Sequence, residues 1–305
     1  MRVITKFDPW NSPLCTCPEK YSLNPYTGCS HGCIYCYATY IPDFFRLRRK
    51  KNLLKRLRKD LGKLPENSLI SMSNSSDPYP PEERIYKDTR KCLKEFENRN
   101  LRILVVTKSN LVTRDLDILK RLRVAVTFTV TTMNEELSKK LEPNAPLPQE
   151  RIDAMRELSK EGIRVGLRLD PVFPFLSEDT HKVIREAKRA GAEHVVTSTF
   201  KPRIDGWKRF EKAFPEVARK LKEIYFKKGE KIGNSWYLPA GMRREIIESV
   251  KKICEKYSLS FASCREGFQD LNTASSCDGS HLIPNKFIFR KRSLNQWIES
   301  DLVEE

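Results

Sequence analysis

The sequence contains no run of about 18 consecutive apolar residues, which is the length that a membrane-spanning helix needs. Its first residues also lack the charged, apolar and small-residue pattern of a secretory signal. We therefore expect neither a transmembrane span nor secretion, and we expect a cytoplasmic protein.

The sequence also has fewer acidic than basic residues. The 305 residues include 40 Asp and Glu against 57 Lys and Arg, so the formal net charge is +17. This excess favours a polyanionic partner such as nucleic acid and disfavours a function for an acidic surface. The alternative is the basic surface of a heat-adapted protein, which needs no such partner.

Cysteine, by contrast, is well represented, with nine residues. Because the cytosol keeps thiols reduced, this number favours metal or redox chemistry over disulfides. Cys29, Cys33 and Cys36 form a C-x3-C-x2-C run that lacks a fourth ligand. Three thiolates leave a tetrahedral zinc site incomplete, whereas a [4Fe-4S] cubane held by three cysteines keeps one iron open to a substrate or cofactor. The alternative is a zinc knuckle completed by His31 or by a distant cysteine.

Short apolar and β-branched stretches alternate with segments of helical periodicity along the chain. The strand-like stretches are the start of 67–79, then 101–109, 124–132, 163–174 and 193–200. This alternation is typical of parallel strands in a βα barrel or in an open doubly wound sheet. About five clear repeats, with a first unit at the cysteine run, fit a partial barrel better than a complete eightfold one. In either architecture, polar residues at the C-terminal ends of the strands face the active site.

The stretch "CSHGCIYCY" resembles the cluster motif of radical S-adenosylmethionine (SAM) enzymes, in which the amino and carboxylate groups of SAM chelate the open iron. Further stretches resemble, in the same order, the branch related to spore photoproduct lyase. They are "LNPYTGC", "SDPY" at 76–79, "VTKS" at 106–109, "LEP" at 141–143 and "RLDPVFP" at 168–174, within about residues 20 to 225.

This resemblance implies an α/β fold with a partial (βα)6 barrel of the TIM type. It implies a [4Fe-4S] cluster, reductive cleavage of SAM, a 5′-deoxyadenosyl radical that abstracts hydrogen from a substrate, and an electron donor such as ferredoxin or flavodoxin. We divide the chain into an N-terminal extension at 1–23, the barrel at 24–228, and a C-terminal extension at 229–305 that packs on the barrel.

The resemblance also implies the site residues. Cys29, Cys33 and Cys36 would ligate the cluster, and Tyr35 would pack near the adenine; Ser73, Asn74 and Ser75 would line the methionine moiety of SAM, and Lys108 and Thr129 would contact its carboxylate and nearby polar atoms. A lysine at a strand end supplies a point charge for a carboxylate, and a hydroxyl supplies a short hydrogen bond. From the residues alone, the simpler interpretation is that Lys108 is a solvated loop lysine and that Thr129 is an ordinary β-branched strand residue.

Arg168 and Asp170 flank an otherwise apolar strand just before a proline. They either form a structural ion pair with each other or bind cofactor and substrate at the mouth of the barrel. We assign no catalytic residue from the sequence.

One departure from the family pattern concerns the hydrogen donor. Spore photoproduct lyases resemble this branch but carry a hydrogen-donating cysteine in the loop aligned with "SMSNSSD". This chain has no cysteine between Cys36 and Cys92, and Cys92 falls within a predicted helix. Photoproduct repair therefore does not follow from the resemblance.

A second set of cysteines lies outside the predicted barrel. Cys15 and Cys17 are near the N-terminus, and Cys264 and Cys277 are in a late stretch rich in Ser and Gly. If the C-terminal segment folds back onto the start of the barrel, these four thiols would hold an auxiliary iron–sulfur cluster or a structural zinc. The alternative is four separate thiols. We expect Cys254, in a helical stretch, to be a core residue.

Three segments combine cations with leucines or aromatics: 44–63, which has helical periodicity, 200–210 with Trp207, and 286–293. In one interpretation, their cations bind phosphates and their rings stack on bases. In the other, the leucines and aromatics belong to the core and the charged side chains form a solvated face.

We accordingly expect a radical SAM enzyme that modifies or repairs a nucleic acid, RNA or DNA. The alternatives are radical modification of a peptide or protein, and a non-catalytic cluster-bearing protein for nucleic-acid binding or electron transfer.

Overall fold

The computed structural model describes residues 2–7, 12–72 and 74–285. Its framework is one sheet whose strands follow each other in chain order. They are β1 (Ile4–Lys6), β2 (Tyr21–Leu23), β5 (Leu69–Met72), β6 (Arg102–Thr107), β7 (Val124–Thr129), β8 (Arg164–Val172), β9 (His194–Thr199) and β12 (Ser260–Ser263). All neighbours from β2 to β12 pair in parallel, and β1 pairs antiparallel at the edge. This sheet confirms the predicted α/β fold of a partial barrel.

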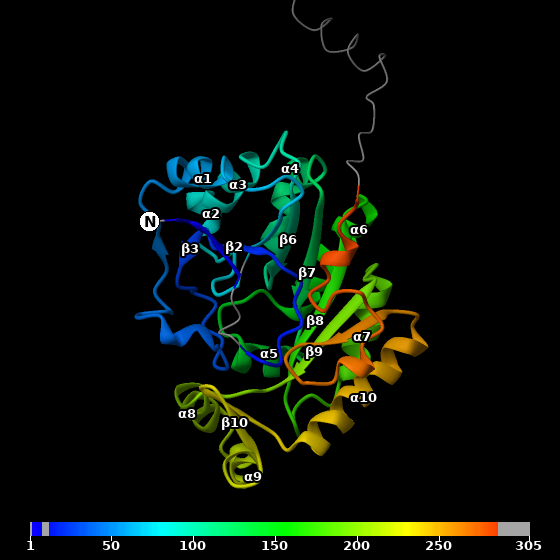
Figure 1. Ribbon diagram of the computed structural model, residues 1–305. Coiled ribbons are helices and arrows are strands. Elements are labelled where there is room, and N and C mark those ends of the chain that lie inside the picture. The colour runs from blue at the N-terminus through cyan, green and yellow to red at the C-terminus, as the bar shows by residue number, and fades with distance from the viewer. Residues whose placement is uncertain (1, 8–11, 73, 286–305) are drawn as a thin grey trace, which may run out of the picture.

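Helices surround the sheet (Figure 1). They are α1 (Leu53–Leu61), α2 (Glu83–Tyr86), α3 (Asp88–Lys94), α4 (Leu116–Leu119), α5 (Glu135–Leu141), α6 (Pro148–Lys160), α7 (Thr180–Arg189), α8 (Ile204–Ala213), α9 (Pro215–Phe226) and α10 (Ala240–Lys256). Two further antiparallel strand pairs lie outside this sheet: β3 (Tyr26–Thr27) with β4 (Arg48–Arg49), and β10 (Glu230–Ile232) with β11 (Ser235–Tyr237). The 3-10 helices are η1 (Ala38–Tyr40), η2 (Asn110–Asp115), η3 (Gln269–Leu271) and η4 (Ser280–Leu282). No helix among the described residues is long and apolar enough to cross a membrane.

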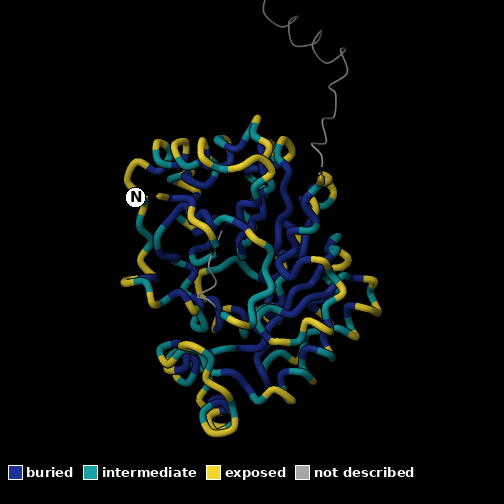
Figure 2. Tube along the Cα trace, in the orientation of Figure 1, coloured by how far each residue is buried: buried dark blue, intermediate teal, exposed yellow. Residues whose placement is uncertain are grey.

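The parallel strands are buried on both faces, which explains their continuous apolar runs. Every residue of β7 and of β9 is buried, and Figure 2 shows the strands as the dark interior of the molecule. The side chains at their C-terminal ends therefore face a space that is shielded by loops rather than open solvent.

The predicted helical segment at 44–63 is a helix only from Leu53 to Leu61. Asn52 has a left-handed backbone with φ of 53°, and residues 48–49 pair with β3 instead of continuing the helix. The helix α1 buries Leu53, Leu57 and Leu61 and directs its Lys and Arg side chains outward. None of these cations lines the cavity described below.

The sheet continues beyond the predicted barrel. Strand β12, in the segment 229–305, pairs in parallel with β9, and α10 packs on both strands. Residues on either side of position 228 thus share one sheet. The division of the chain into three parts stays a prediction.

Helices α8 and α9 surround a second, aromatic core near the β10–β11 hairpin. Trp207 is only 5% exposed and packs against Phe210, Tyr225 and Phe226. Of the two interpretations given for this segment, base stacking or core, the second therefore holds for the ring of Trp207. The segment 286–293 lies outside the described residues.

Candidate active site

A cavity of about 440 Å³ opens at the C-terminal ends of the parallel strands. The strand-end residues that line it are Asn24 after β2, Asn74 and Ser75 after β5, Thr107 and Lys108 at β6, Thr129 at β7, Arg168 and Asp170 in β8, and Ser198 and Thr199 in β9. Polar side chains at the carboxyl ends of parallel strands are where ligands bind in folds of this type.

Cys29, Cys33 and Cys36 form part of the cavity wall. They lie in the loop between β3 and η1, and Cys29 and Cys33 are buried whereas Cys36 is half-buried. Burial raises the pKa of Cys29 to about 12 and also raises the pKa of Cys33. The thiols are therefore protonated until a metal displaces their protons.

Asp77, the acid of the "SDPY" stretch, joins three parts of the site. Its carboxylate accepts hydrogen bonds from Thr107 Oγ1 at 2.7 Å, from the Lys108 N–H at 2.7 Å and from the Tyr79 N–H at 2.9 Å, and it lies 3.5 Å from His31 Nε2. Burial opposes its ionisation, but His31, Thr107 and the Tyr79 N–H outweigh burial and hold its pKa at about 2. Asp77 thus ties the cysteine loop to the ends of β5 and β6.

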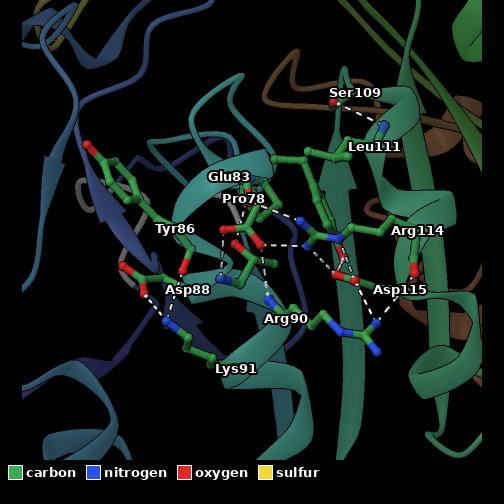
Figure 3. A network of polar contacts seen from close by, with 12 residues as sticks. Pro78, Glu83, Tyr86, Asp88, Arg90, Lys91, Ser109, Leu111, Arg114 and Asp115 are labelled. Atoms are coloured by element: carbon green, nitrogen blue, oxygen red, sulfur yellow. Dashed lines mark hydrogen bonds and ion pairs between the residues drawn. The ribbon is translucent and has the colours of Figure 1, made fainter.

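A buried polar network supports the loop that carries Asp77 (Figure 3). Tyr79 donates its hydroxyl to Asp115 at 3.2 Å, and Arg114 donates to Asp115 and to the fully buried Glu83. Arg90 adds a 2.9 Å bond to Asp115. Because each buried carboxylate has cationic partners, the network is satisfied and holds the loop in one conformation.

Tyr35 and Lys108 face each other beside the cysteines. The Tyr35 hydroxyl donates to Glu142, which forms a buried ion pair with Arg151 at 2.5 Å. The ammonium of Lys108 lies 5.6 Å from the centre of the Tyr35 ring. Burial lowers the pKa of Lys108, but the nearby carboxylates of Glu142 and Asp77 oppose burial, so the pKa is raised and the side chain stays cationic. A fixed cation therefore stands next to the thiols.

Arg168 and Asp170 form an ion pair at 2.8 Å while both line the cavity. The Ser198 hydroxyl donates to the second oxygen of Asp170 at 2.5 Å. The two interpretations of this pair, structural and ligand-binding, are thus compatible in geometry.

The sequence matches the radical SAM superfamily over residues 23–187, which is more than half of the chain. The chain belongs to the radical SAM superfamily. Membership implies a [4Fe-4S] cluster and SAM as cofactors. The matched region begins at β2 and ends in α7, so it includes the cysteine loop and most of the strand ends around the cavity.

Several proteins are similar to this chain in sequence. An uncharacterised protein of Methanocaldococcus jannaschii is 33% identical over 174 residues, and an uncharacterised protein of the Acidianus two-tailed virus is 28% identical over 200 residues. These matches cover 55% and 58% of this chain, and in both cases 66% of the relative, slightly less than two thirds of its length. The radical SAM Nalpha-GlyT isomerase of Pseudomonas phage M6 is 24% identical over 265 residues, which cover 81% of this chain and 54% of that protein.

Spore photoproduct lyase is similar in fold. A mutant of it superposes with a TM-score of 0.67 at 18% identity, over 85% of this chain and 78% of the lyase chain. A complex of the lyase with dinucleoside spore photoproduct gives a TM-score of 0.65 at 17% identity, over 80% and 75% of the two chains. At such low identity the superposition shows a shared fold.

The residues of this radical SAM chain fit a cubane better than a single metal ion. Among the described residues, no three His, Cys, Asp or Glu side chains converge closely enough to hold one ion. In a cubane each thiolate binds a different iron, so its sulfurs need not converge on one point. His31 is buried, with Nδ1 3.3 Å from the Asn144 carbonyl and Nε2 near Asp77, so it is already engaged within the protein. The zinc-knuckle alternative therefore has no support in this geometry.

The structure brings the predicted SAM contacts together. Tyr35, Asn74, Ser75, Lys108, Thr129, Arg168 and Asp170 all line the cavity that the three cysteines line, whereas Ser73 lies outside the described residues. Asn74 is held by a 2.8 Å bond from its amide nitrogen to Ser22 Oγ, and its carbonyl accepts the Tyr37 hydroxyl at 2.8 Å. Their individual contacts with SAM stay predictions.

Sequence reasoning missed the aromatic rim of the cavity, which we define as Tyr37, Tyr40, Phe44 and Phe45. Three of these side chains are substantially exposed: Tyr37 by 39%, Tyr40 by 47% and Phe45 by 40%. The available signal was the density of aromatics directly after the third cysteine, in "YATYIPDFF".

Proposed function

We propose that this chain is a radical SAM enzyme that reductively cleaves SAM and modifies or repairs a nucleic acid. The observation that supports it best is one cavity with three cysteines in its wall and exposed aromatic rings at its rim. When bound, the [4Fe-4S] cluster would pass an electron from a ferredoxin or flavodoxin to SAM, which yields methionine and the 5′-deoxyadenosyl radical.

The chain's own residues would hold these groups in place. Cys29, Cys33 and Cys36 would ligate the cluster after losing their protons. Lys108, kept cationic by its neighbours, would face the carboxylate of SAM, and Tyr35, fixed through Glu142, would restrict the position of the adenine. The loops over the strand ends would exclude water from the reacting atoms.

The aromatic rim supports a nucleic-acid substrate. Six large hydrophobic side chains are exposed in the part of the chain that the structure describes, and three of them belong to the rim. The Arg203 guanidinium lies 5.5 Å from the Tyr40 ring centre, and that of Arg209 lies 5.4 Å from the Phe45 ring centre. The exposed rings offer a stacking surface for bases, and because Arg203 and Arg209 share a single carboxylate, that of Asp205, net positive charge is left beside the rings for phosphates.

One comparison agrees with this substrate class. A solved structure of similar fold holds spore photoproduct lyase with a dinucleoside photoproduct. Spore photoproduct repair itself is not part of the proposal, because the loop at 71–77 has no cysteine in the position of the family's hydrogen donor.

The test combines binding with turnover under anaerobic conditions. We expect single-stranded DNA or RNA oligonucleotides to bind with an affinity that falls steeply with salt, and 5′-deoxyadenosine to form in the presence of SAM and reductant. Replacing Phe45 or Tyr40 by Ala should weaken oligonucleotide binding roughly tenfold, or about 1.4 kcal/mol, which lies within the range of about 1–3 kcal/mol for one stacked base.

Phe175 provides the matched control. It is 51% exposed and pairs with a lysine, Lys220, at 5.9 Å, but it does not line the cavity. Phe175→Ala should leave binding unchanged. Equal losses in Phe45→Ala and Phe175→Ala, or binding that is indifferent to salt, would contradict a nucleic-acid substrate and favour a peptide. Absence of 5′-deoxyadenosine from cluster-loaded protein would favour a non-catalytic role.

A further inference from the structure

Seven of the nine cysteines line one cavity, although four of them are far from the C-x3-C-x2-C loop in sequence. Cys15 and Cys17 precede β2, Cys264 directly follows β12, and Cys277 lies just before η4. The sulfur atoms of Cys17 and Cys277 are 3.5 Å apart. The remaining two, Cys92 in α3 and Cys254 in α10, are fully buried in the core, which confirms the prediction made for Cys254.

The segments that carry Cys17 and Cys277 are fixed to each other by contacts that need no metal. Lys20 Nζ lies 2.5 Å from Asp278 Oδ2, and both side chains are about 4% exposed. The segment of Cys277 is also held against the starts of β6 and β7, where Arg123 Nε donates to the Pro284 carbonyl at 2.9 Å and Arg102 donates to the Ser280 carbonyl at 3.2 Å. Figure 1 shows the two segments, blue and orange-red, next to each other over the sheet. The approach of these thiols is therefore built into the fold.

Cys264 is fixed by the sheet itself. Its N–H donates to the Thr197 carbonyl of β9 at 2.8 Å, and its own carbonyl accepts from Lys201 Nζ at 3.3 Å. It therefore reaches the cavity from the same edge of the sheet as Ser198 and Asp170. The N-terminal segment, the last parallel strand and the C-terminal segment thus bring four thiols to one space.

We propose that Cys15, Cys17, Cys264 and Cys277 bind a second iron–sulfur cluster, which shares the cavity with the SAM-binding cluster. Four cysteine thiolates are the usual ligand set of both [2Fe-2S] and [4Fe-4S] centres. A structural zinc would need at least three of these sulfurs to converge on one ion, and no such group exists among the described residues. Such a cluster would leave no iron open, so its role differs from that of the SAM-binding centre.

The test measures iron and acid-labile sulfide after anaerobic reconstitution of the full chain. A Cys29/Cys33/Cys36→Ala triple variant should keep iron and sulfide in equal amounts, at roughly half the wild-type content if both centres are [4Fe-4S]. Its reduced EPR signal should not change when SAM is added. A Cys17/Cys277→Ala double variant should lose the other part of the iron and keep the SAM-sensitive signal.

A Cys92/Cys254→Ala double variant is the control, because it removes two thiols outside the cavity; it should retain the wild-type metal content. Circular dichroism on each variant separates loss of metal from loss of fold. Cys264→Ser is a fourth variant that replaces only one proposed ligand sulfur by oxygen, and it too should lower the iron content. Iron absent from the folded triple variant, zinc in place of iron, or a Cys17–Cys277 disulfide in peptides from the isolated protein would each overturn the proposal. Because this test involves no oligonucleotide, its outcome is independent of the proposed substrate.

Discussion

Gly28 shows how a single residue shapes the cysteine loop. Its backbone has a φ of +82°, and a Cβ here would lie 2.5 Å from the Arg46 carbonyl oxygen and 2.7 Å from that of Phe44. The next residue, Cys29, donates its N–H to the same Phe44 carbonyl at 2.7 Å. Glycine is the residue that tolerates both the left-handed backbone and the close approach, so the position of Cys29 depends on it.

We therefore expect Gly28→Ala to reduce the iron content of the reconstituted protein and to lower its thermal stability. Gly233→Ala is the control, because Gly233 also has a positive φ, of +60°, but nothing lies within 4 Å of its added Cβ. That control should lose only about 1–2 kcal/mol, the cost of a left-handed alanine, with full iron content. Iron analysis and thermal unfolding measure both effects, and identical behaviour of the two variants would contradict the role assigned to Gly28.

At the scale of elements, helix α8 holds the cysteine loop from outside the sheet. Arg209 donates from Nε to the Ile34 carbonyl at 2.9 Å and from Nη2 to the Cys36 carbonyl at 3.1 Å. Asp205, one turn earlier, pairs with Arg209 at 2.8 Å and accepts the Thr39 hydroxyl. The basic segment at 200–210 thus contributes its arginine to the loop, whereas the tryptophan that drew attention in the sequence belongs to the core.

Arg209→Met should make the cluster loop less rigid, since it removes two charge-assisted hydrogen bonds to backbone carbonyls. We expect iron to leave the reconstituted protein for a chelator on the order of ten times faster, in line with about 1.5–3 kcal/mol for bonds to a charged group. Lys212→Met, on an exposed position of the same helix, should leave the rate unchanged. Unchanged iron loss in Arg209→Met, measured by absorbance of the iron–chelator complex, would show that the loop does not depend on α8.

At the scale of the whole molecule, the buried pair Lys20–Asp278 joins parts of the chain that are 258 residues apart. The N-terminal segment and the C-terminal segment both run over the strand ends, so the cavity is enclosed by sequence from opposite ends of the chain. The ion pair therefore determines the shape of the cavity as well as stability.

Lys20→Met would leave the Asp278 carboxylate buried without its cation, so we expect a loss of about 3–5 kcal/mol in the free energy of unfolding. Lys6→Met removes an exposed pair with Glu19, in which both side chains are more than three quarters accessible, and should cost less than about 1 kcal/mol. Urea unfolding gives both values. Amide hydrogen exchange within residues 12–20 should be faster in Lys20→Met than in the wild type and unchanged in Lys6→Met. Equal exchange in the two variants would show that the Lys20–Asp278 ion pair does not hold the N-terminal segment in place.

The sequence by itself determined the alternation of strands β5 to β9 with helices, the α/β class and the cluster motif. These depend on local signals: apolar runs such as 124–129 are buried on both faces, and three cysteines within eight residues need no tertiary information to be recognised. Lys108 was expected in the site because of the family resemblance, whereas Asp170, at the end of an apolar strand, also agreed with the rule that ligands bind at the carboxyl edge of a parallel sheet.

Only the tertiary structure decided which distant residues share the cavity. Nothing in local periodicity distinguishes the exposed Phe45 from the buried Trp207, because their exposure depends on which neighbours cover each ring. The approach of Cys17 to Cys277 depends on a buried ion pair and on hydrogen bonds to loop carbonyls, contacts between segments that have no fixed spacing in sequence. Local pattern thus specifies elements and their order, whereas the packing of loops against the finished sheet specifies the site.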